Sequence, residues 1–402
     1  MNNGWIESEI KLTIGMLVSN NIDYIRRAME ALKPLLEAVP SELLVVDTVG
    51  EKTDGSIAVV REYTDKIYPF AWCDDFSAAR NVCFEHARGE WFLYQDDDEV
   101  FDDVTELIGF FQSGEYQNYG AGYYGVLNHK ADGSAQKAVV GRMVRRRENT
   151  RFVGKIHEHF NEVHEPFKSF SCFVHHYGYY FENEEANKAH QKRNVSLLLQ
   201  EIKENGYTPQ MCAQLMQEFM SRKETAAEGF RFFEQCIGEL VQHWNLMDSC
   251  IQWMLVTSAR YFSIIDHYEG LLLQAKKIKE EYELSQVAQM ALAGVVVANA
   301  APQGDVGTIL DYAPMYYHAW NWVKTHETEA IPQKQLDFPK YLTQDYAVQV
   351  FQAAATCANA VREYKLAYAY WEQLPWDDKN FDGSRYAKAM QETLTGLEGE
   401  NK

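Results

Sequence analysis

Short apolar runs and helical stretches alternate along the first 180 residues of the chain. The apolar runs of strand type are 11–19, 43–49, 67–70 and 91–95, and the stretches with helical spacing between them are 22–36, 56–63 and 76–88. This β-α-β-α-β order is typical of a mostly parallel sheet with helices on its faces. Three more strands are predicted farther along, at 121–128, 138–147 and 168–177.

Helical patterns dominate after about residue 185. They cover 186–203, 210–222, 226–243, 251–261, 268–282, 286–298 and 346–373, with breaks at Asn205-Gly206, Pro209, Pro302-Gln303-Gly304 and Pro332. Pairs of helices at intervals of about 35–40 residues are typical of helical-repeat arrays. At 402 residues the chain is long enough for two hydrophobic cores. The sequence therefore predicts an α/β domain at 1–184 and an all-α repeat domain at 185–402.

Acidic residues stand at the ends of two predicted strands. Asp47 lies near the end of the run 43–49, and Asp96-Asp97-Asp98-Glu99 follows the run 91–95 directly. Ligands of parallel sheets bind beyond the carboxyl ends of the strands, so these residues are expected to converge on one site. Neighbouring carboxylates raise one another's pKa unless a cation is present, and hard ions such as Mg²⁺ or Mn²⁺ prefer carboxylate oxygens. The alternative is a solvated acidic turn.

The composition and charge of the chain disfavour several classes of protein and of binding partner. The formal net charge of −20 disfavours binding to nucleic acid or to an anionic membrane surface. No run of about 18 apolar residues predicts a membrane span, and Met1–Ile10 lacks the pattern of a signal peptide, so a cytoplasmic location is the default expectation. Seven cysteines without paired spacing argue against a disulfide framework or a thiolate zinc site.

Four motifs follow one another in a fixed order along the first 180 residues. Trp72 and Asp74–Asn81 look like W-x-D-D-F-S-x-A-R-N, and Trp91–Glu99 resembles W-x-x-x-x-D-A-D-E. Gly154–Glu158 is similar to G-[RK]-[IV]-H-E, and His176–Tyr179 is similar to H-x-G-Y. In this order the motifs resemble those of bacterial family-two glycosyltransferases. The resemblance covers about residues 11–180 and implies a GT-A fold, which in this group is often followed by tetratricopeptide-like helical repeats. Peptide S-glycosyltransferases that modify bacteriocins look like members of the same group.

The resemblance implies a role for each matching residue. The nucleotide sugar, expected to be a UDP-sugar, would contact Asp47, Asp75, Arg80, Asp96 and Asp97. The metal, Mn²⁺ or Mg²⁺, would be held by Asp98, His176 and Asp96, with His175 as the second choice for the histidine. Two departures affect the donor: Asn20-Asn21 stands where the family has Asn-Glu, and the loop 47–56 is two residues longer. The identity of the sugar and of the nucleotide therefore stays open.

Glu158 is the residue expected to act as general base. An inverting sugar transfer needs a group that takes the proton of the acceptor as the acceptor attacks the anomeric carbon. Residue type and family position favour Glu158, with His157 orienting it or sharing the role. The alternative is that Glu158 only binds the acceptor or holds its loop. Zinc hydrolysis is disfavoured, because the H-E-x-x-H spacing is absent although five histidines lie between 157 and 176.

The acceptor is expected to be a peptide, a protein or a cell-surface glycan. Tyrosines near the predicted mouth would stack on the acceptor or pack the seam between domains: Tyr116, Tyr119, Tyr123, Tyr124, Tyr177, Tyr179 and Tyr180. A group of arginines would attract a diphosphate or an acidic acceptor, or form a solvated strand face: Arg142, Arg145, Arg146, Arg147 and Arg151. The helical half is expected to present a groove for a peptide or protein, or to form a homodimer interface.

A metal-dependent transferase of a hexose or N-acetylhexosamine is the leading interpretation, and two others stay open. A non-catalytic binding module on the same fold would not need Glu158 together with Asp98 and His176. A nucleotidyltransferase on the same fold usually carries a glycine-rich basic loop after the first strand, which Ser19-Asn20-Asn21-Ile22 does not provide.

Overall fold

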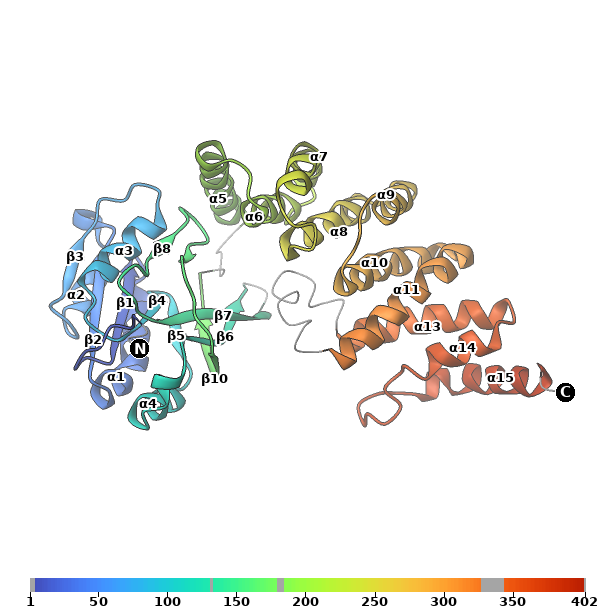
Figure 1. The fold of residues 1–402 in the computed structure, drawn as a ribbon, viewed down its shortest axis with the longest axis horizontal. Coiled ribbons are helices and arrows are strands. Elements are labelled where there is room, and N and C mark those ends of the chain that lie inside the picture. The colour runs from blue at the N-terminus through green and yellow to red at the C-terminus, as the bar shows by residue number, and fades with distance from the viewer. Residues whose placement is uncertain (1–3, 131–132, 179–183, 327–342, 401–402) are drawn as a thin grey trace. The chain divides into compact units, whose positions relative to one another are not determined.

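A computed structural model describes residues 4–130, 133–178, 184–326 and 343–400. The chain divides into two compact units, Met1–Glu201 and Ile202–Lys402. The first unit is a mixed α/β domain and the second is all helical, which confirms the predicted fold class (Figure 1). Most of α5 (Glu184–Asn205) belongs to the first unit, whereas the predicted boundary at residues 184 and 185 assigned this helix to the second.

The first unit is built on an eight-stranded sheet with the order β3-β2-β1-β4-β7-β6-β10-β5. Its strands are β1 (Leu12–Val18), β2 (Ser41–Asp47), β3 (Ile67–Pro69), β4 (Trp91–Asp96), β5 (Glu99–Phe101), β6 (Ala121–His129), β7 (Ala135–Arg145) and β10 (Phe167–His176). The strands β8 (Phe152–Val153) and β9 (His159–Phe160) form a separate two-stranded sheet. The first four strands in the order are parallel, while β7 runs antiparallel to β4, and β5 runs antiparallel to β10. The predicted parallel core and the three later strands are thus confirmed, whereas the short β5 was not predicted.

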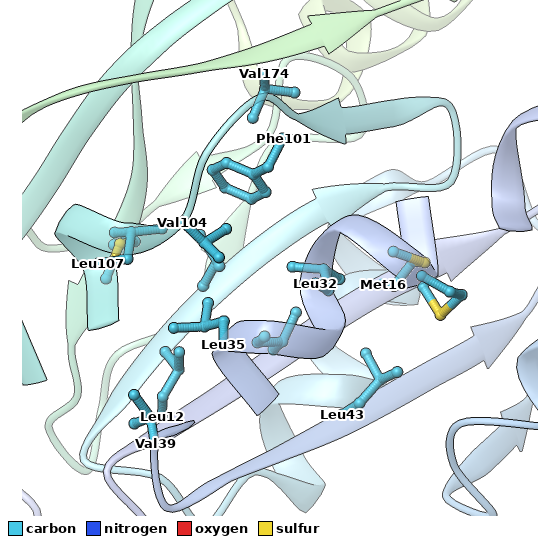
Figure 2. Packing of buried hydrophobic residues seen from close by; sticks show 14 of the residues in the cluster. Leu12, Met16, Leu32, Leu35, Val39, Leu43, Phe101, Val104, Leu107 and Val174 are labelled. Atoms are coloured by element: carbon cyan, nitrogen blue, oxygen red, sulfur yellow. The ribbon is translucent and has the colours of Figure 1, made fainter. Parts of the chain in front are cut away.

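Helices cover both faces of this sheet. The helices α1 (Ile22–Ala38) and α4 (Thr105–Gln112) pack on one face with α2 (Ser56–Val60) beside α1, and α3 (Phe76–His86) packs on the other. Alternate residues of β1 point to opposite faces, so Leu12 and Met16 join the cluster under α1 while Leu17 joins the cluster under α3. Figure 2 shows Leu32 and Leu35 of α1 facing the strands of the first cluster.

The chain reverses its winding direction between β1 and β4, and such a reversal is where ligands of open α/β sheets bind. In the parallel register Val18 of β1 lies beside Asp47 of β2, and Leu17 lies beside Asp96 of β4. Asp47 and Asp96 therefore flank the end of β1 at the same edge of the sheet.

The second unit consists of helices that pack in consecutive pairs. They are α6 (Pro209–Met220), α7 (Ala226–His243), α8 (Ser249–Ile264), α9 (Tyr268–Glu281), α10 (Gln286–Gln303), α11 (Val306–Thr325), α13 (Gln344–Ala360), α14 (Tyr364–Trp371) and α15 (Ser384–Glu400). The pairs are α6 with α7, α8 with α9, α10 with α11, and α13 with α14. Three successive pairs begin at Pro209, Ser249 and Gln286, an interval of about 40 residues that is typical of helical repeats.

The single helix predicted over 346–373 is wrong. The helix α13 ends at Ala360 and α14 begins at Tyr364, because Arg362 between them takes a left-handed conformation with a φ of 65°, which stops the helical hydrogen bonding. The turn contains neither glycine nor proline, so its sequence gives no sign of a break. The helices α4, α11 and α15 were not predicted, and the break predicted at Pro332 lies outside the described residues.

Candidate active site

A cavity of about 440 Å³ lies at the carboxyl ends of β1 and β4. The predicted site residues that line it are Arg80, Asp96, Asp97, Asp98, His157, Glu158 and His176. They come from α3, from the end of β4, from the loop between β8 and β9, and from the end of β10. Segments far apart in the sequence thus meet at one edge of the sheet.

Asp47 and Asp75 are not among the lining residues and bond to their own backbone segments. Asp47 Oδ1 accepts hydrogen bonds from two backbone N–H groups of the loop after β2, both at 2.9 Å. The next residue, Thr48, does line the cavity. Asp75 caps the N-terminus of α3, where its Oδ1 accepts from the backbone N–H of Ala78 at 2.8 Å. Both carboxylates shape loops beside the cavity, and their contact with a nucleotide stays a prediction.

Asp97 connects the acidic run to the loop after β1 through hydrogen bonds. Its Oδ2 accepts hydrogen bonds from the backbone N–H and the hydroxyl of Ser19 at 2.6 and 3.1 Å, and its Oδ1 accepts from Asn21 Nδ2 at 2.7 Å. Burial raises the pKa of Asp97 to about 6. A glutamate at position 21, as in the family pattern, would set a second carboxylate against Asp97. The asparagine avoids that repulsion and donates a hydrogen bond to Asp97 instead.

A buried guanidinium links Asp96 to Glu158. Arg80 is 4% exposed, its Nη2 donates to Asp96 Oδ1 at 2.7 Å, and its Nε donates to Glu158 Oε1 at 2.5 Å. Burial opposes ionisation of Asp96, but the charges of Arg80 and Arg142 outweigh it and lower the pKa of Asp96. Asp96 is therefore ionised at neutral pH, and Glu158 is held by a fixed donor.

Arg142 of β7 supplies a second buried guanidinium. Its Nη2 donates to Glu99 Oε1 at 2.6 Å, and its Nη1 donates to Asp96 Oδ2 at 3.3 Å. The guanidinium carbons of Arg80 and Arg142 lie 4.5 and 4.4 Å from the ring centroid of Tyr94, so both cations contact this ring. The sequence named Arg142 as one of five arginines that would attract a diphosphate or an acidic acceptor, or form a solvated strand face, and it did not name Tyr94 as a site residue.

The other arginines of that segment do not gather around Arg142. Arg146 is buried and donates to a backbone carbonyl at 2.7 Å. Arg145 and Arg147 lie 5.1 and 4.2 Å from the ring centroid of Trp5. The segment is therefore not one positive patch, because successive side chains along a strand point to different neighbours.

The pairing of β10 with its neighbours places His176 beside Asp98. The register sets His176 next to Glu99 of β5 on one side and Asn128 of β6 on the other. His176 Nδ1 lies 2.7 Å from Asn128 Oδ1 as hydrogen-bond partner, and His176 Nε2 lies 3.6 Å from Asp98 Oδ1. A Cβ at Gly178 would come within 2.6 Å of Asp98 Oδ2 and of His176 Nε2, so glycine leaves room between the two side chains and the chain.

Asp98 and His176 form a donor pair that fits a divalent cation. Asp98 Oδ1 is buried and has no hydrogen-bond partner in the described part of the chain. Burial and the neighbouring carboxylates raise the pKa of Asp98, so a cation is needed to keep it ionised. Burial lowers the pKa of His176 to about 4, so its ring is neutral at pH 7. The carboxylate oxygen suits Mg²⁺ or Mn²⁺, and the imidazole nitrogen suits a transition metal ion such as Mn²⁺ better than the harder Mg²⁺.

The described residues offer this pair rather than a larger protein cage. Among them, no group of three His, Cys, Asp or Glu side chains is placed to hold a metal ion. Both oxygens of Asp96, the third predicted ligand, are bonded to Arg80 and Arg142. Mg²⁺ sites are often completed by substrate phosphates and water, so two protein ligands are compatible with a metal–diphosphate site.

Glu158 and His157 stand in a loop that is held at several points. Gly154 and His157 have left-handed backbone conformations, with φ values of 96° and 54°. The backbone carbonyl of Lys155 accepts from the Phe76 N–H at 2.8 Å, and its N–H donates to a carboxylate of α5 at 3.2 Å. Burial lowers the pKa of His157, so this ring is neutral at pH 7. The loop gives Glu158 a defined position, while its role as base stays a prediction.

The helix α5 lines the cavity with residues that the sequence analysis missed. They are His190, Arg193 and Asn194, and Trp72 and Phe76 from the segment before and at the start of α3 line it as well. The Arg193 guanidinium lies 5.7 Å from the ring centroid of Phe76. No sequence pattern pointed to α5, because its helical periodicity assigned it to the second domain.

Three of the tyrosines predicted near the mouth, Tyr116, Tyr124 and Tyr177, do not line the cavity. Tyr116 and Tyr124 are buried in the core under α1 and α4. Tyr177 stacks on His129 at 4.9 Å, and His129 Nε2 contacts His175 Nδ1 at 2.9 Å. His175, the second choice for the metal histidine, therefore pairs with another histidine. Tyr179 and Tyr180 lie outside the described residues.

The chain is similar to a family model, to a curated protein and to several solved structures. Residues 13–180 match the family model of Glycosyl transferase family 2. A TPR repeat-containing protein of Synechococcus elongatus is 30% identical over 151 residues, which are 37% of this chain and 35% of that protein. The chain is also similar to the structure of S. aureus TarS, with 13% identity, a TM-score of 0.35, and coverage of 68% of this chain and 55% of TarS. A structure of the mannosyltransferase PcManGT from Pyrobaculum calidifontis in complex with GDP-Man and Mn²⁺ shows 13% identity, a TM-score of 0.33, and coverage of 69% and 91%.

The fold and the cavity define the first unit as a GT-A-like α/β domain. Residues 13–180 are similar to the domains of Glycosyl transferase family 2, which transfer sugar from nucleotide sugars. The likenesses to solved structures are remote and add nothing to this assignment. The chain spans 35% of the length of the Synechococcus relative and 55% of the TarS chain. No helix in the described part of the chain has the length and apolar character needed to cross a membrane.

Proposed function

We propose that this chain transfers a hexose or N-acetylhexosamine from a UDP-sugar to a peptide, protein or glycan, with inversion at the anomeric carbon and with Mn²⁺ or Mg²⁺ as cofactor. One observation carries the proposal: a single cavity holds an oriented carboxylate, Glu158, and the carboxylate–imidazole pair of Asp98 and His176. These are the groups that an acceptor and a metal-bound diphosphate require, respectively.

The donor would bind in the cavity beside the end of β1 and the acidic run. Thr48 lines the cavity next to the loop after β2, where a nucleoside would sit, and Asp96 is the ionised acceptor for a ribose hydroxyl. Asp98 and His176 would hold the metal, which neutralises charge on the departing diphosphate. Arg80, with a buried side chain at the same place, keeps Asp96 in position.

Glu158 would act as the base. In an inverting transfer, the bond between the acceptor atom and the anomeric carbon forms while the bond from that carbon to the diphosphate oxygen breaks, and the acceptor proton passes to Glu158. Arg80 Nε fixes Glu158 Oε1, which leaves the second carboxylate oxygen for the proton. His157, whose ring is neutral at pH 7, would orient the acceptor group or share the role of base.

Incubation with Mn²⁺ and a panel of nucleotide sugars tests this proposal. We expect a rise in melting temperature with UDP-sugars and metal-dependent release of UDP, and both effects should vanish when the metal is chelated. If no UDP- or GDP-sugar raised the melting temperature or released its nucleotide, the proposal would be refuted. A shift in melting temperature without sugar transfer would favour the non-catalytic module, and release of pyrophosphate from a nucleoside triphosphate would favour the nucleotidyltransferase.

The helical region is proposed to bind the acceptor or a second copy of the chain. The consecutive helix pairs of the second unit are typical of repeat arrays that bind peptides. The resemblance to bacteriocin S-glycosyltransferases favours a peptide with a hydroxyl or thiol side chain as acceptor. Light scattering of the full chain and of a chain ending at Glu201 tests the dimer, and a dimer that survives the truncation would refute an interface in the second unit.

A further inference from the structure

The cavity combines many carboxylates with few cations. Its lining includes the carboxylates of Asp96, Asp97, Asp98 and Glu158, and its arginines are Arg80, Arg142 and Arg193. A diphosphate carries negative charge into this group, so it needs cationic donors in addition to a metal ion. Arg142 comes from β7 and belongs to none of the four motifs, yet it contacts both ends of the acidic run, Asp96 and Glu99.

Arg142 is held in a way that fixes its guanidinium toward this run. Its side chain is 12% exposed, and its contacts to Glu99 Oε1 and Asp96 Oδ2 use Nη2 and Nη1. The ring of Tyr94 lies 4.4 Å from its guanidinium carbon and prevents it from leaving on that side. A planar cation locked by two carboxylates and an aromatic ring is preorganised to bind a planar or tetrahedral oxyanion.

Arg80 and Arg142, whose side chains are 5% and 12% exposed, each retain an N–H group for which the described residues supply no hydrogen-bond partner. These groups are Arg80 Nη1 and Arg142 Nε. A buried N–H on a charged group costs free energy when it is left unsatisfied, and phosphate oxygens are its strongest partners. Both residues line the cavity, and both share Asp96, so their remaining donors serve one region.

We propose that Arg142 is a diphosphate-recognition residue of this site and works as a pair with Arg80 across the ring of Tyr94. The inference rests on the proposed function and adds a cation that no motif provides. In this arrangement Glu99 and Asp96 position Arg142, and its Nε takes an oxygen of the donor diphosphate. Arg80, which also holds Glu158, takes another oxygen through Nη1, so the phosphates and the base are connected through one guanidinium.

The test measures binding of UDP and of uridine, in the presence of Mn²⁺, to full-length wild type, Arg142→Gln and Arg142→Lys. We expect Arg142→Gln to weaken UDP binding at least tenfold and to leave uridine binding within about twofold, because a charged hydrogen bond to phosphate is lost. Arg142→Lys should keep part of the affinity, since it keeps the charge but not the fork of donors. Arg145→Gln, on the same strand but against Trp5, is the matched control and should bind UDP like wild type.

The outcomes separate this inference from the function on which it rests. Folded Arg142 variants that bind UDP as wild type does, or that lose uridine and UDP equally, would overturn the role of Arg142 in phosphate recognition. Wild type that binds neither UDP nor another nucleoside diphosphate would overturn the proposed function itself. If Arg142→Gln does not fold, Arg142→Lys decides: an unchanged ratio of UDP to uridine affinity overturns the inference, and a reduced ratio supports it.

Discussion

Replacing Glu158 by glutamine removes the proposed base and leaves the size and shape of the side chain almost unchanged. The side chain is 11% exposed, and its Oε1 accepts from Arg80 Nε at 2.5 Å. Glutamine keeps an oxygen at the position of Oε1, so the hydrogen bond from Arg80 can persist. What disappears is a negative charge and the oxygen that takes the acceptor proton.

The expected loss of rate follows from the chemistry of the lost group. General base catalysis contributes about 10²–10⁴-fold, so kcat of Glu158→Gln should fall by about that factor. The cost in stability should be smaller than the roughly 3–5 kcal/mol of a fully orphaned buried charge, because Asp96 remains 2.7 Å from Arg80. We expect about 1–2 kcal/mol, the net value of a hydrogen bond that loses its charged partner.

The assay compares turnover and binding in the same preparation. UDP release from the active nucleotide sugar gives kcat, isothermal titration with UDP and Mn²⁺ gives the dissociation constant, and urea unfolding gives stability. UDP affinity should stay within about threefold of wild type, since Glu158 is placed on the acceptor side of the reaction. Glu162→Gln is the matched control: Glu162 lies four residues later, accepts from Thr150 Oγ1 at 2.7 Å, and is not a lining residue of the cavity. Near-normal turnover of folded Glu158→Gln would refute its role as base.

Three further predictions concern the metal pair, the space beside it and a buried carboxylate elsewhere. His176→Ala should lower Mn²⁺ affinity at least tenfold, measured by titration followed by electron paramagnetic resonance. His175→Ala is the control and should not lower it, because the ring of His175 contacts His129. Equal Mn²⁺ affinities of the two variants would contradict the role of Asp98 and His176 as the metal-binding pair. Gly178→Ala should also lower Mn²⁺ affinity with little change in melting temperature, because its Cβ would come within 2.6 Å of His176 Nε2, and unchanged affinity would mean that the neighbours move aside. Glu42 of β2 is buried, and hydrogen bonds from Lys66, Arg88 and Thr13 outweigh its burial and lower its pKa from 4.5 to about 2. This stabilisation is present above pH 4.5 and is lost as pH falls toward 2. Glu42→Gln should therefore lower the free energy of unfolding in urea by about 3 kcal/mol at pH 7 and by progressively less below pH 4.5. A difference in unfolding free energy that does not change with pH would contradict the pKa argument.

The order of elements in the first unit followed from local patterns. The runs at 11–19, 43–49 and 91–95 are apolar because their strands are buried on both faces, and such runs can be read without knowledge of neighbours. Elements whose formation depends on their surroundings were missed. The strand β5 has three residues and exists through its pairing with β10, and the break at Arg362 needs no special residue type.

The sequence by itself determined the fold class, the edge of the sheet at which the site lies, and the residue types that gather there. Asp96, Asp98, Glu158 and His176 were selected as candidates through the resemblance of four motifs to family-two glycosyltransferases, and such motifs are runs of neighbouring residues along the chain. Only the tertiary structure decided which of four adjacent acids meets which partner: Asp97 turns to Ser19, Asp98 to His176, and Asp96 to two arginines. It also brought Arg142 into the site. These choices follow from the registers between β4 and β7 and between β6 and β10, which are set by the packing of the whole sheet and leave no mark in local sequence.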